Sequence, residues 1–144
     1  MTNNARDAVA SAKIAASSEE VWRALTSPEL IEQYFLGTRV ETTWEVGSPI
    51  TFSGEWQGKR YQDHGAILAA EPPQLLRISH YSPLSGKPDV PENYHSVEYR
   101  VTNDGDAASR VTITQSNNTS EGEAAESEKT WHLILGNLKE LLEG

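Results

Sequence analysis

Between Ser120 and Gly144, large apolar side chains recur every three or four residues, the spacing that places them along one face of an α-helix. They are Trp131, Ile134, Leu135, Leu138, Leu141 and Leu142. Ser120 and Glu123 form a Ser-x-x-Glu pattern, which satisfies free backbone N–H groups at the start of a helix. The sequence therefore predicts a long amphipathic helix that begins after Ser120 and covers a sheet.

The middle of the chain alternates between apolar and polar residues instead. From Thr38 to Asn117 the period is two and turn residues recur about every ten positions, which predicts a meander of antiparallel strands. A weaker alternation over Ala8 to Ala15 predicts a further strand at the start. Two short helices follow it, one capped by Ser17 and one capped by Ser27 with Pro28 at its first position. The fold class expected is α+β, with about seven strands.

Hairpin turns fix which strand residues stand opposite one another, so the alternation also predicts a register. When the alternation is continued across the turn at Pro72-Pro73, His64 pairs with His80 on the inner face. The next hairpin then pairs His80 with His95. The last hairpin pairs Val97 with Gln115. Three histidines and a glutamine are therefore expected together at one end of the inner face.

The first half of the long helix carries small and polar residues where its apolar stripe would continue. These are Ala124, Ser127 and Glu128. One interpretation is that they leave a cavity above the polar end of the sheet, since a buried carboxylate needs a partner. The other is that these turns extend beyond the sheet into water. Similarly, the connection from Pro83 to Asn93 either closes the mouth of the cavity or is a passive surface loop.

The cavity interpretation predicts a small-molecule site with an apolar body and a few polar groups that orient the ligand. Ile134 is expected to contribute to its apolar wall. The candidate ligand-binding residues are Phe52, Trp56, His64, Ile78, His80, His95, Val97, Tyr99, Gln115, Ser127, Glu128 and Trp131.

Metal and catalytic chemistry are less well supported. The three histidines and Glu128 are suitable metal donors, but a straight row across strands about 4.8 Å apart converges poorly on one ion. We therefore expect no metal and no other cofactor. Motifs for nucleophilic serine, zinc protease, phosphate-binding and dinucleotide-binding sites are absent. A pair formed by Glu128 and a histidine is the remaining acid–base candidate, and no catalytic residue is assigned.

Composition narrows the functional classes. With 144 residues and 37% hydrophobic content, the chain is expected to form a single domain over residues 8–144 after a flexible segment, residues 1–7. Its net charge of -9 disfavours nucleic acid and anionic membranes as partners. It lacks cysteine, so thiol nucleophiles and disulfides are excluded. No apolar run approaches the ~20 residues of a membrane helix and no signal-peptide core is present, so a cytoplasmic location is expected.

The order of elements resembles the helix-grip fold of the SRPBCC superfamily, which includes START lipid-transfer domains and polyketide cyclases. More narrowly, the chain resembles homologues of the C-terminal domain of the activator of heat-shock-protein-90 ATPase. The resemblance is carried by Ala15 to Leu30, by Gly65 to Leu68, by Pro72 to Leu76, and by Trp131 to Leu142. It implies a seven-stranded antiparallel sheet curved around the last helix, with a cavity that takes hydrophobic ligands in many relatives.

The resemblance transfers no catalytic residues, because the family has no universal ones. This sequence also reads Gln33-Tyr34-Phe35 where many relatives have a Trp-Trp pair, and it has no counterpart of the co-chaperone's separate N-terminal domain. Three hypotheses follow. The first is a non-enzymatic binder of a small hydrophobic or amphipathic molecule, the second a cyclase or hydrolase, and the third a chaperone-associated interaction module. Leu133 lies opposite the buried stripe, and an exposed apolar side chain there is compatible with self-association as a homodimer.

Overall fold

The computed structural model describes residues 7–105 and 107–144, without the side chain of Trp56. The predicted flexible segment lies, apart from Asp7, outside the described residues. The strands are β1 (Ala8–Ile14), β2 (Arg39–Glu41), β3 (Pro49–Trp56), β4 (Lys59–Glu71), β5 (Leu75–His80), β6 (His95–Asn103) and β7 (Ser109–Gln115). The helices are α1 (Ser18–Leu25), α2 (Pro28–Tyr34) and α3 (Glu121–Glu143), and two 3₁₀ turns, η2 (Pro83–Ser85) and η3 (Pro91–Asn93), lie between β5 and β6.

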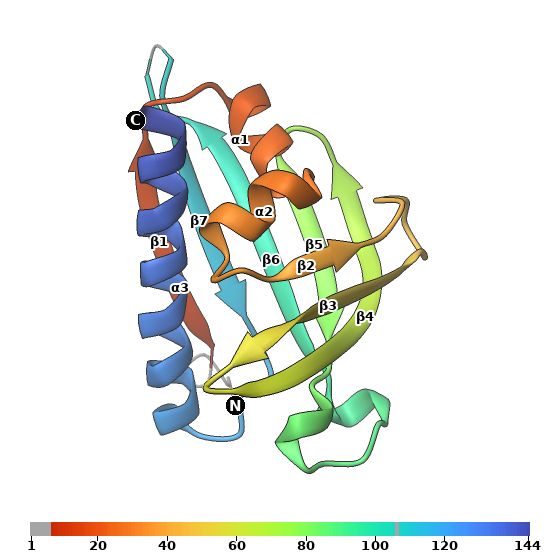
Figure 1. The fold of residues 1–144 in the computed structure, drawn as a ribbon. Helices are drawn as coiled ribbons and strands as arrows, with labels where there is room; N and C mark the ends of the chain where they lie inside the picture. Colours follow the sequence, from red (N-terminus) through yellow and green to blue (C-terminus); the bar gives the residue numbers. More distant parts are fainter. Residues whose placement is uncertain (1–6, 106) are drawn as a thin grey trace, which may run out of the picture.

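The seven strands form one antiparallel sheet in the order β1-β7-β6-β5-β4-β3-β2. The sheet is curved, and α3 lies along it next to β1, while α1 and α2 cover one end (Figure 1). This arrangement is the helix-grip fold, so the predicted fold class is confirmed. It leaves the N-terminal half of α3 beside the opposite end of the sheet, away from α1 and α2.

The helix starts follow the predicted capping residues. Ser17 and Glu20 form a reciprocal capping box, and the Ser27 hydroxyl accepts a hydrogen bond from the backbone N–H of Leu30. At α3, the Ser120 hydroxyl accepts from Glu123 N, while the Glu123 carboxylate turns back to the backbone N–H of Thr119. Glu123 is thereby held at the first turn of α3, where a negative charge is also favoured by the helix dipole.

The core lies between the inner face of the sheet and the helices. The largest fully buried apolar side chains come from the sheet, from the predicted stripe of α3 and, for one residue, from α1: Ile14, Val21, Ile50, Ile67, Leu76, Val101, Val111, Ile113, Ile134, Leu135 and Leu138. Leu141 and Leu142, at the end of the stripe, are half-buried and pack against this core. The helical and strand periodicities in the sequence thus identify the buried faces of α3, β5, β6 and β7.

Two of the predicted strand pairings are correct. Opposite His80 lies His95, and opposite Val97 lies Gln115. The pairing of His64 with His80 is wrong: Ile67 is opposite Ile78, and His64 is opposite Tyr81. A bulge between Ile67 and Ala69 adds one residue to β4. Each β4 side chain before the bulge therefore points to the opposite face of the sheet from the one predicted.

The reversal changes which β4 side chains face the helix. Ile67 is buried and Leu68 is 45% exposed, the opposite of the predicted alternation. Gly65 lies against β5, where an added Cβ would stand 1.7 Å from the Ser79 carbonyl oxygen. At the start of the predicted meander, β2 is short: it ends at Glu41, and Trp44 adopts a positive φ of 67°.

The edge strand β1 is joined to α3 through side chains that reach its backbone. Glu128 Oε2 accepts a hydrogen bond from Val9 N (3.1 Å), Glu143 Oε2 accepts one from Ala15 N (2.8 Å), and Lys139 Nζ donates one to Lys13 O (3.0 Å). These contacts occupy backbone groups that an edge strand leaves free. They also fix the position of α3 on the β1 side of the sheet.

Candidate functional site

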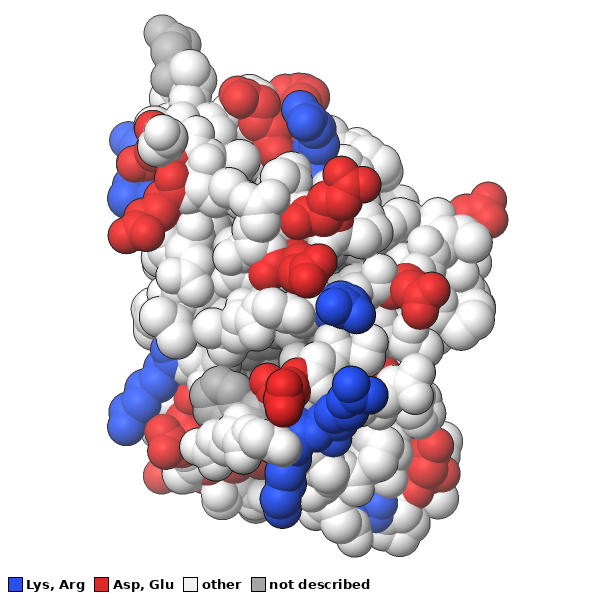
Figure 2. Space-filling view, in the orientation of Figure 1, with Lys and Arg blue, Asp and Glu red and all other residues white. Residues whose placement is uncertain are grey.

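A cavity of about 490 Å³ lies between α3 and the inner face of the sheet. Figure 2 shows that this face of the molecule is hollowed between α2 and the β3–β4 hairpin. The lining residues come from strands β3 to β7, from α3, from the segment after α2 and from the connection after β5: Phe35, Leu36, Thr38, Phe52, Tyr61, Asp63, Ile78, His80, Ser82, Leu84, Val97, Tyr99, Gln115, Glu123, Glu126, Ser127, Thr130, Trp131 and Ile134.

Aromatic rings form much of the apolar wall. Trp131 on α3 stands edge-on to Tyr99 on β6, with ring centroids 6.0 Å apart, and edge-on to Phe35 after α2, at 5.6 Å. These are favoured aromatic geometries. Burial raises the pKa of the Tyr99 phenol, so it is neutral at physiological pH. The wall is therefore apolar and well packed around the space it encloses.

Gln115, at the end of β7, links the sheet to α3 at the cavity wall. Its Oε1 accepts a hydrogen bond from Trp131 Nε1 (2.8 Å), and its Nε2 donates to Ser127 Oγ (3.2 Å) and to Asn118 Oδ1 (3.0 Å). Each polar atom of the amide thus has a partner within the protein. Gln115 consequently positions the cavity wall, and its polar groups are already engaged.

Asp63 and His80 form a second polar contact in the cavity. Asp63 Oδ2 lies 2.8 Å from His80 Nε2, and their side chains are only 14% and 29% exposed. The Phe52 ring stands edge-on to the imidazole, with centroids 5.4 Å apart. The other carboxylate oxygen, Asp63 Oδ1, is buried without a hydrogen bond in the described part of the chain. His80 is thus held by a carboxylate in largely apolar surroundings.

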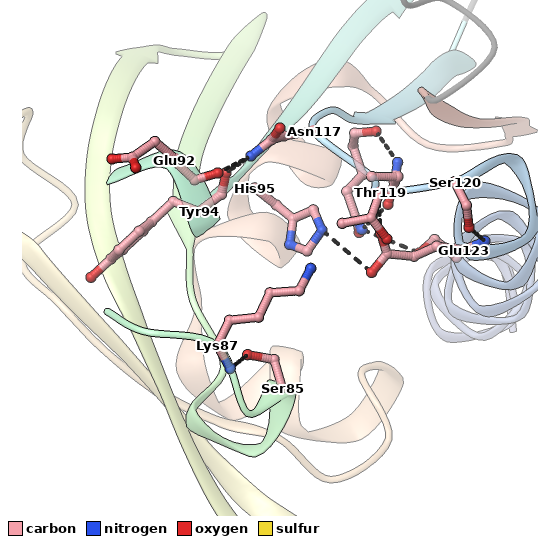
Figure 3. A network of polar contacts seen from close by, with 12 residues as sticks. Ser85, Lys87, Glu92, Tyr94, His95, Asn117, Thr119, Ser120 and Glu123 are labelled. Carbon is pink, nitrogen blue, oxygen red and sulfur yellow. Dashed lines mark hydrogen bonds and ion pairs between the residues drawn. The ribbon is translucent and has the colours of Figure 1, made fainter. Parts of the chain in front are cut away.

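A third polar group surrounds His95, next to His80 on the neighbouring strand (Figure 3). His95 Nε2 lies 4.0 Å from Glu123 Oε2, and Lys87 points toward both. Burial lowers the pKa of His95, and the attraction of Glu123 opposes this. Repulsion by Lys87, and by His80 whenever its ring is protonated, lowers the pKa of His95 further. Burial raises the pKa of Glu123, but hydrogen bonds from Thr119 outweigh this and the net shift is downward. His95 is therefore neutral, and Glu123 ionised, at neutral pH.

The connection between β5 and β6 contacts both the cavity and the outer face of the sheet. Ser82 and Leu84 line the cavity, and Leu84 is 60% exposed at its rim. Farther along, Asp89 lies 3.2 Å from His64 Nε2 and accepts a 2.6 Å hydrogen bond from the Tyr94 hydroxyl. Of the two interpretations of this connection, contact with the mouth of the cavity therefore applies to its first part only. Its second part is held on the outside of the sheet.

The structure places most of the predicted site residues at the cavity. Those that line it are Phe52, Ile78, His80, Val97, Tyr99, Gln115, Ser127 and Trp131. His95 lies beside His80 but is not among the lining residues. The side chain of Trp56 lies outside the described part of the chain.

Two predicted site residues lie elsewhere. His64 points to the outer face, because the β4 bulge reverses its side of the strand. Glu128 is turned toward β1, where it accepts the hydrogen bond from Val9 N. Both predictions of a cavity position are wrong.

Several lining residues were not predicted. Tyr61 and Asp63 on β4 face the cavity, although the predicted alternation placed them on the outer face of the sheet. The same alternation, corrected for the bulge, places both residues on the inner face. Glu123, Glu126 and Thr130 lie on the side of the α3 stripe away from β1. Phe35, Leu36 and Thr38 follow α2, and no periodic signal in the sequence marks them as lining residues.

No group of three or more His, Cys, Asp or Glu side chains in the described part is arranged to hold a metal ion. Among the described residues, no helix is long and apolar enough to cross a membrane.

Comparison with known proteins shows how the chain is related. A solution structure from Cytophaga hutchinsonii is 44% identical, covering 95% of this chain and 93% of that one, with a TM-score of 0.81. The crystal structure of CalU16 from Micromonospora echinospora is 28% identical, covering 99% and 81%, with a TM-score of 0.74. The Aha1 dimer from Colwellia psychrerythraea, 19% identical over 95% and 96% with a TM-score of 0.72, shares the fold.

No curated protein matches the chain. Residues 15–143 match the family described as activator of Hsp90 ATPase homolog 1-like protein. This match covers both short helices, six of the strands and all of α3. The chain therefore belongs to the activator of Hsp90 ATPase homolog 1-like family.

Proposed function

We propose that the protein binds a small hydrophobic or amphipathic molecule in the cavity between the sheet and α3. The observation that carries this proposal is the cavity itself, about 490 Å³, whose wall is largely apolar with several polar side chains among its lining residues. Small-molecule sites typically measure roughly 300–1,000 Å³ and combine these two features. A ligand that replaces water against this apolar wall gains roughly 25 cal/mol per Å² of apolar surface buried.

The distribution of polar groups supports an amphipathic ligand. Ile78, Val97 and Trp131 surround the apolar body, while His80 and Glu123 lie toward the end where β5 and β6 meet the start of α3. An apolar chain or ring system would occupy the body, and a hydrogen-bonding group would lie against the polar end. We place this function in the cytoplasm and without a cofactor.

Two other roles are kept as alternatives. A chaperone-associated role is suggested by the family name alone. Self-association is suggested by Leu133, 54% exposed on α3, and by a solved Aha1 dimer that shares the fold. Neither explains why the interior is hollow, so ligand binding is the function we favour.

A fluorescence titration with 1-aminoanthracene, a neutral apolar probe, tests the proposal. We expect saturable binding to the wild-type protein and a loss of affinity of at least about tenfold, roughly 1.4 kcal/mol, in Ser127→Phe, which fills the cavity. The matched control is Ala125→Phe, which adds the same ring to the exposed side of α3. Equal affinity in both variants, or no saturable binding to folded wild type, would overturn the proposal.

A further inference from the structure

We propose that Asp63 and His80 form a general-base pair, and that the cavity accepts apolar molecules with an acidic C–H group, such as one next to a carbonyl. This inference rests on the proposed binding function and adds a reaction to it. The pair lines the cavity, with Asp63 Oδ2 2.8 Å from His80 Nε2. An ionised carboxylate only accepts hydrogen bonds, so Nε2 carries the proton and Nδ1 holds a lone pair in the neutral ring.

The lone pair on His80 Nδ1 accepts no hydrogen bond from the described part of the chain. His80 makes one hydrogen bond there, through Nε2 to Asp63. Asp63 Oδ1 is the one described side-chain N or O atom that is both buried and without a partner, so Nδ1 is exposed to solvent, on a ring that lines the cavity. A base on a ring that lines a binding cavity is within reach of a bound molecule.

Asp63 has the features of a positioning residue for this base. It holds the imidazole in one tautomer, and its charge stabilises the imidazolium that forms when Nδ1 takes a proton. The Phe52 ring packs edge-on against the imidazole and limits its rotation. The neighbouring charged groups, Glu123 and Lys87, face His95 instead. His80 is therefore the cavity-lining histidine that has a carboxylate partner on one ring nitrogen and no partner on the other among the described residues.

The proton transfer is complete without a cofactor. His80 Nδ1 takes the proton, the C–H bond breaks, and its electron pair moves to the carbonyl oxygen as the enolate forms. The imidazolium then returns the proton to carbon, so no oxidant or other reactant is consumed. A hydrogen-bond donor is available in the same cavity, since the Tyr99 hydroxyl is kept neutral by burial and has no hydrogen-bond partner in the described part of the chain.

A probe reaction tests the base without knowledge of the natural ligand. In 5-nitrobenzisoxazole, a base removes the proton on C3, the C–H electron pair forms the nitrile, and the N–O bond breaks to give a coloured phenolate. We expect the wild-type protein to accelerate this reaction, and His80→Gln to lower kcat by about a hundredfold with KM unchanged. Asp63→Asn should lower kcat by a smaller factor, since it keeps a hydrogen-bond acceptor but removes the charge.

His64→Gln is the matched control, because His64 also contacts a carboxylate, Asp89, at 3.2 Å, but on the outer face. It should leave kcat unchanged. Competition between the benzisoxazole and 1-aminoanthracene reports binding separately. A benzisoxazole that binds but reacts no faster than in buffer, or that loses its rate in His95→Gln rather than in His80→Gln, overturns this inference and leaves ligand binding intact. Absence of binding by both probes overturns the binding proposal as well.

Discussion

Trp131 on α3 donates a hydrogen bond from its indole Nε1 to Oε1 of Gln115 on β7, at 2.8 Å. This contact joins the covering helix to the sheet at the wall of the cavity. The indole N–H has no other partner among the described residues, and Trp131 is buried. The hydrogen bond therefore allows a large aromatic side chain to form the wall without an unsatisfied donor.

Loss of this acceptor should destabilise the fold. In Gln115→Leu, the indole N–H of Trp131 is left unpaired in apolar surroundings, and we expect the free energy of unfolding to fall by about 1–3 kcal/mol. Urea unfolding measures it. Gln62→Leu, at an exposed position on β4, serves as the control and should change stability by less than about 0.5 kcal/mol. Equal effects of the two substitutions would contradict the role assigned to Gln115.

The close approach of β4 and β5 requires glycine at position 65. An alanine Cβ there would lie 1.7 Å from the Ser79 carbonyl oxygen, so the strands must separate beside His80. We expect Gly65→Ala to lower the free energy of unfolding by about 3 kcal/mol or more. Gly136→Ala is the control, because its Cβ meets no atom within 4 Å. In that exposed helical position alanine should stabilise the protein by about 0.5–1 kcal/mol.

The hydrogen bond from Val9 N to Glu128 should protect the edge of β1 from opening. In Glu128→Ala this backbone N–H loses its 3.1 Å partner, and we expect its hydrogen exchange to accelerate about tenfold. Amide exchange followed by NMR measures the rate at Val9. Glu140→Ala, at an exposed position on the same helix, should leave that rate unchanged. Unchanged exchange in Glu128→Ala would show that the contact does not protect the strand.

Stability should fall on mild acidification because of His95. Burial lowers its pKa in the folded state below the ordinary value of 6.5, so the unfolded chain takes up this proton first as the pH falls. The contribution of neutral His95 to the free energy of unfolding is fully present above pH 6.5. It is lost as the pH falls through 6.5 toward the pKa of His95 in the folded state. Glu123, whose pKa is lowered from 4.5, contributes its own loss only in more acidic solution.

Urea unfolding at several pH values between about 7 and about 5 tests this effect. His95→Gln should flatten the decline in this window, because glutamine does not titrate. An equally steep decline in the variant would assign the effect to other groups. His132→Gln, on the exposed side of α3, is the control and should retain the wild-type slope.

Alternation in the sequence predicted most of the sheet because short turns fix register. The turn after Asn103 is short and its flanking strands have clear apolar positions, so the pairing of Val97 with Gln115 followed directly. The β4–β5 hairpin differs, because its bulge lies beside Ala69 and Ala70. Because both residues are alanine, the sequence does not show which of them faces the core. The alternation of apolar and polar residues therefore does not reveal the extra residue of the bulge.

The helix stripe located the cavity but not all of its polar lining. Ala124 and Ser127 interrupt the stripe and do lie against the interior. A stripe has two sides, however, and sequence alone does not say which strand lies beside each. Glu128 is on the side next to β1, while Glu123 and Glu126 are on the side that lines the cavity. Which side faces the hollow depends on the curvature of the whole sheet.

NMR mapping of the 1-aminoanthracene site tests ligand binding in the cavity most directly. The account predicts saturable shifts of the Trp131 indole N–H and of the Ile78, Val97 and Ile134 methyl groups, which line the cavity. Methyl groups of Val101, buried but outside the lining, should stay unchanged. Shifts confined to exposed apolar residues such as Val46, which is 65% exposed, or no shifts at saturating probe, would contradict it.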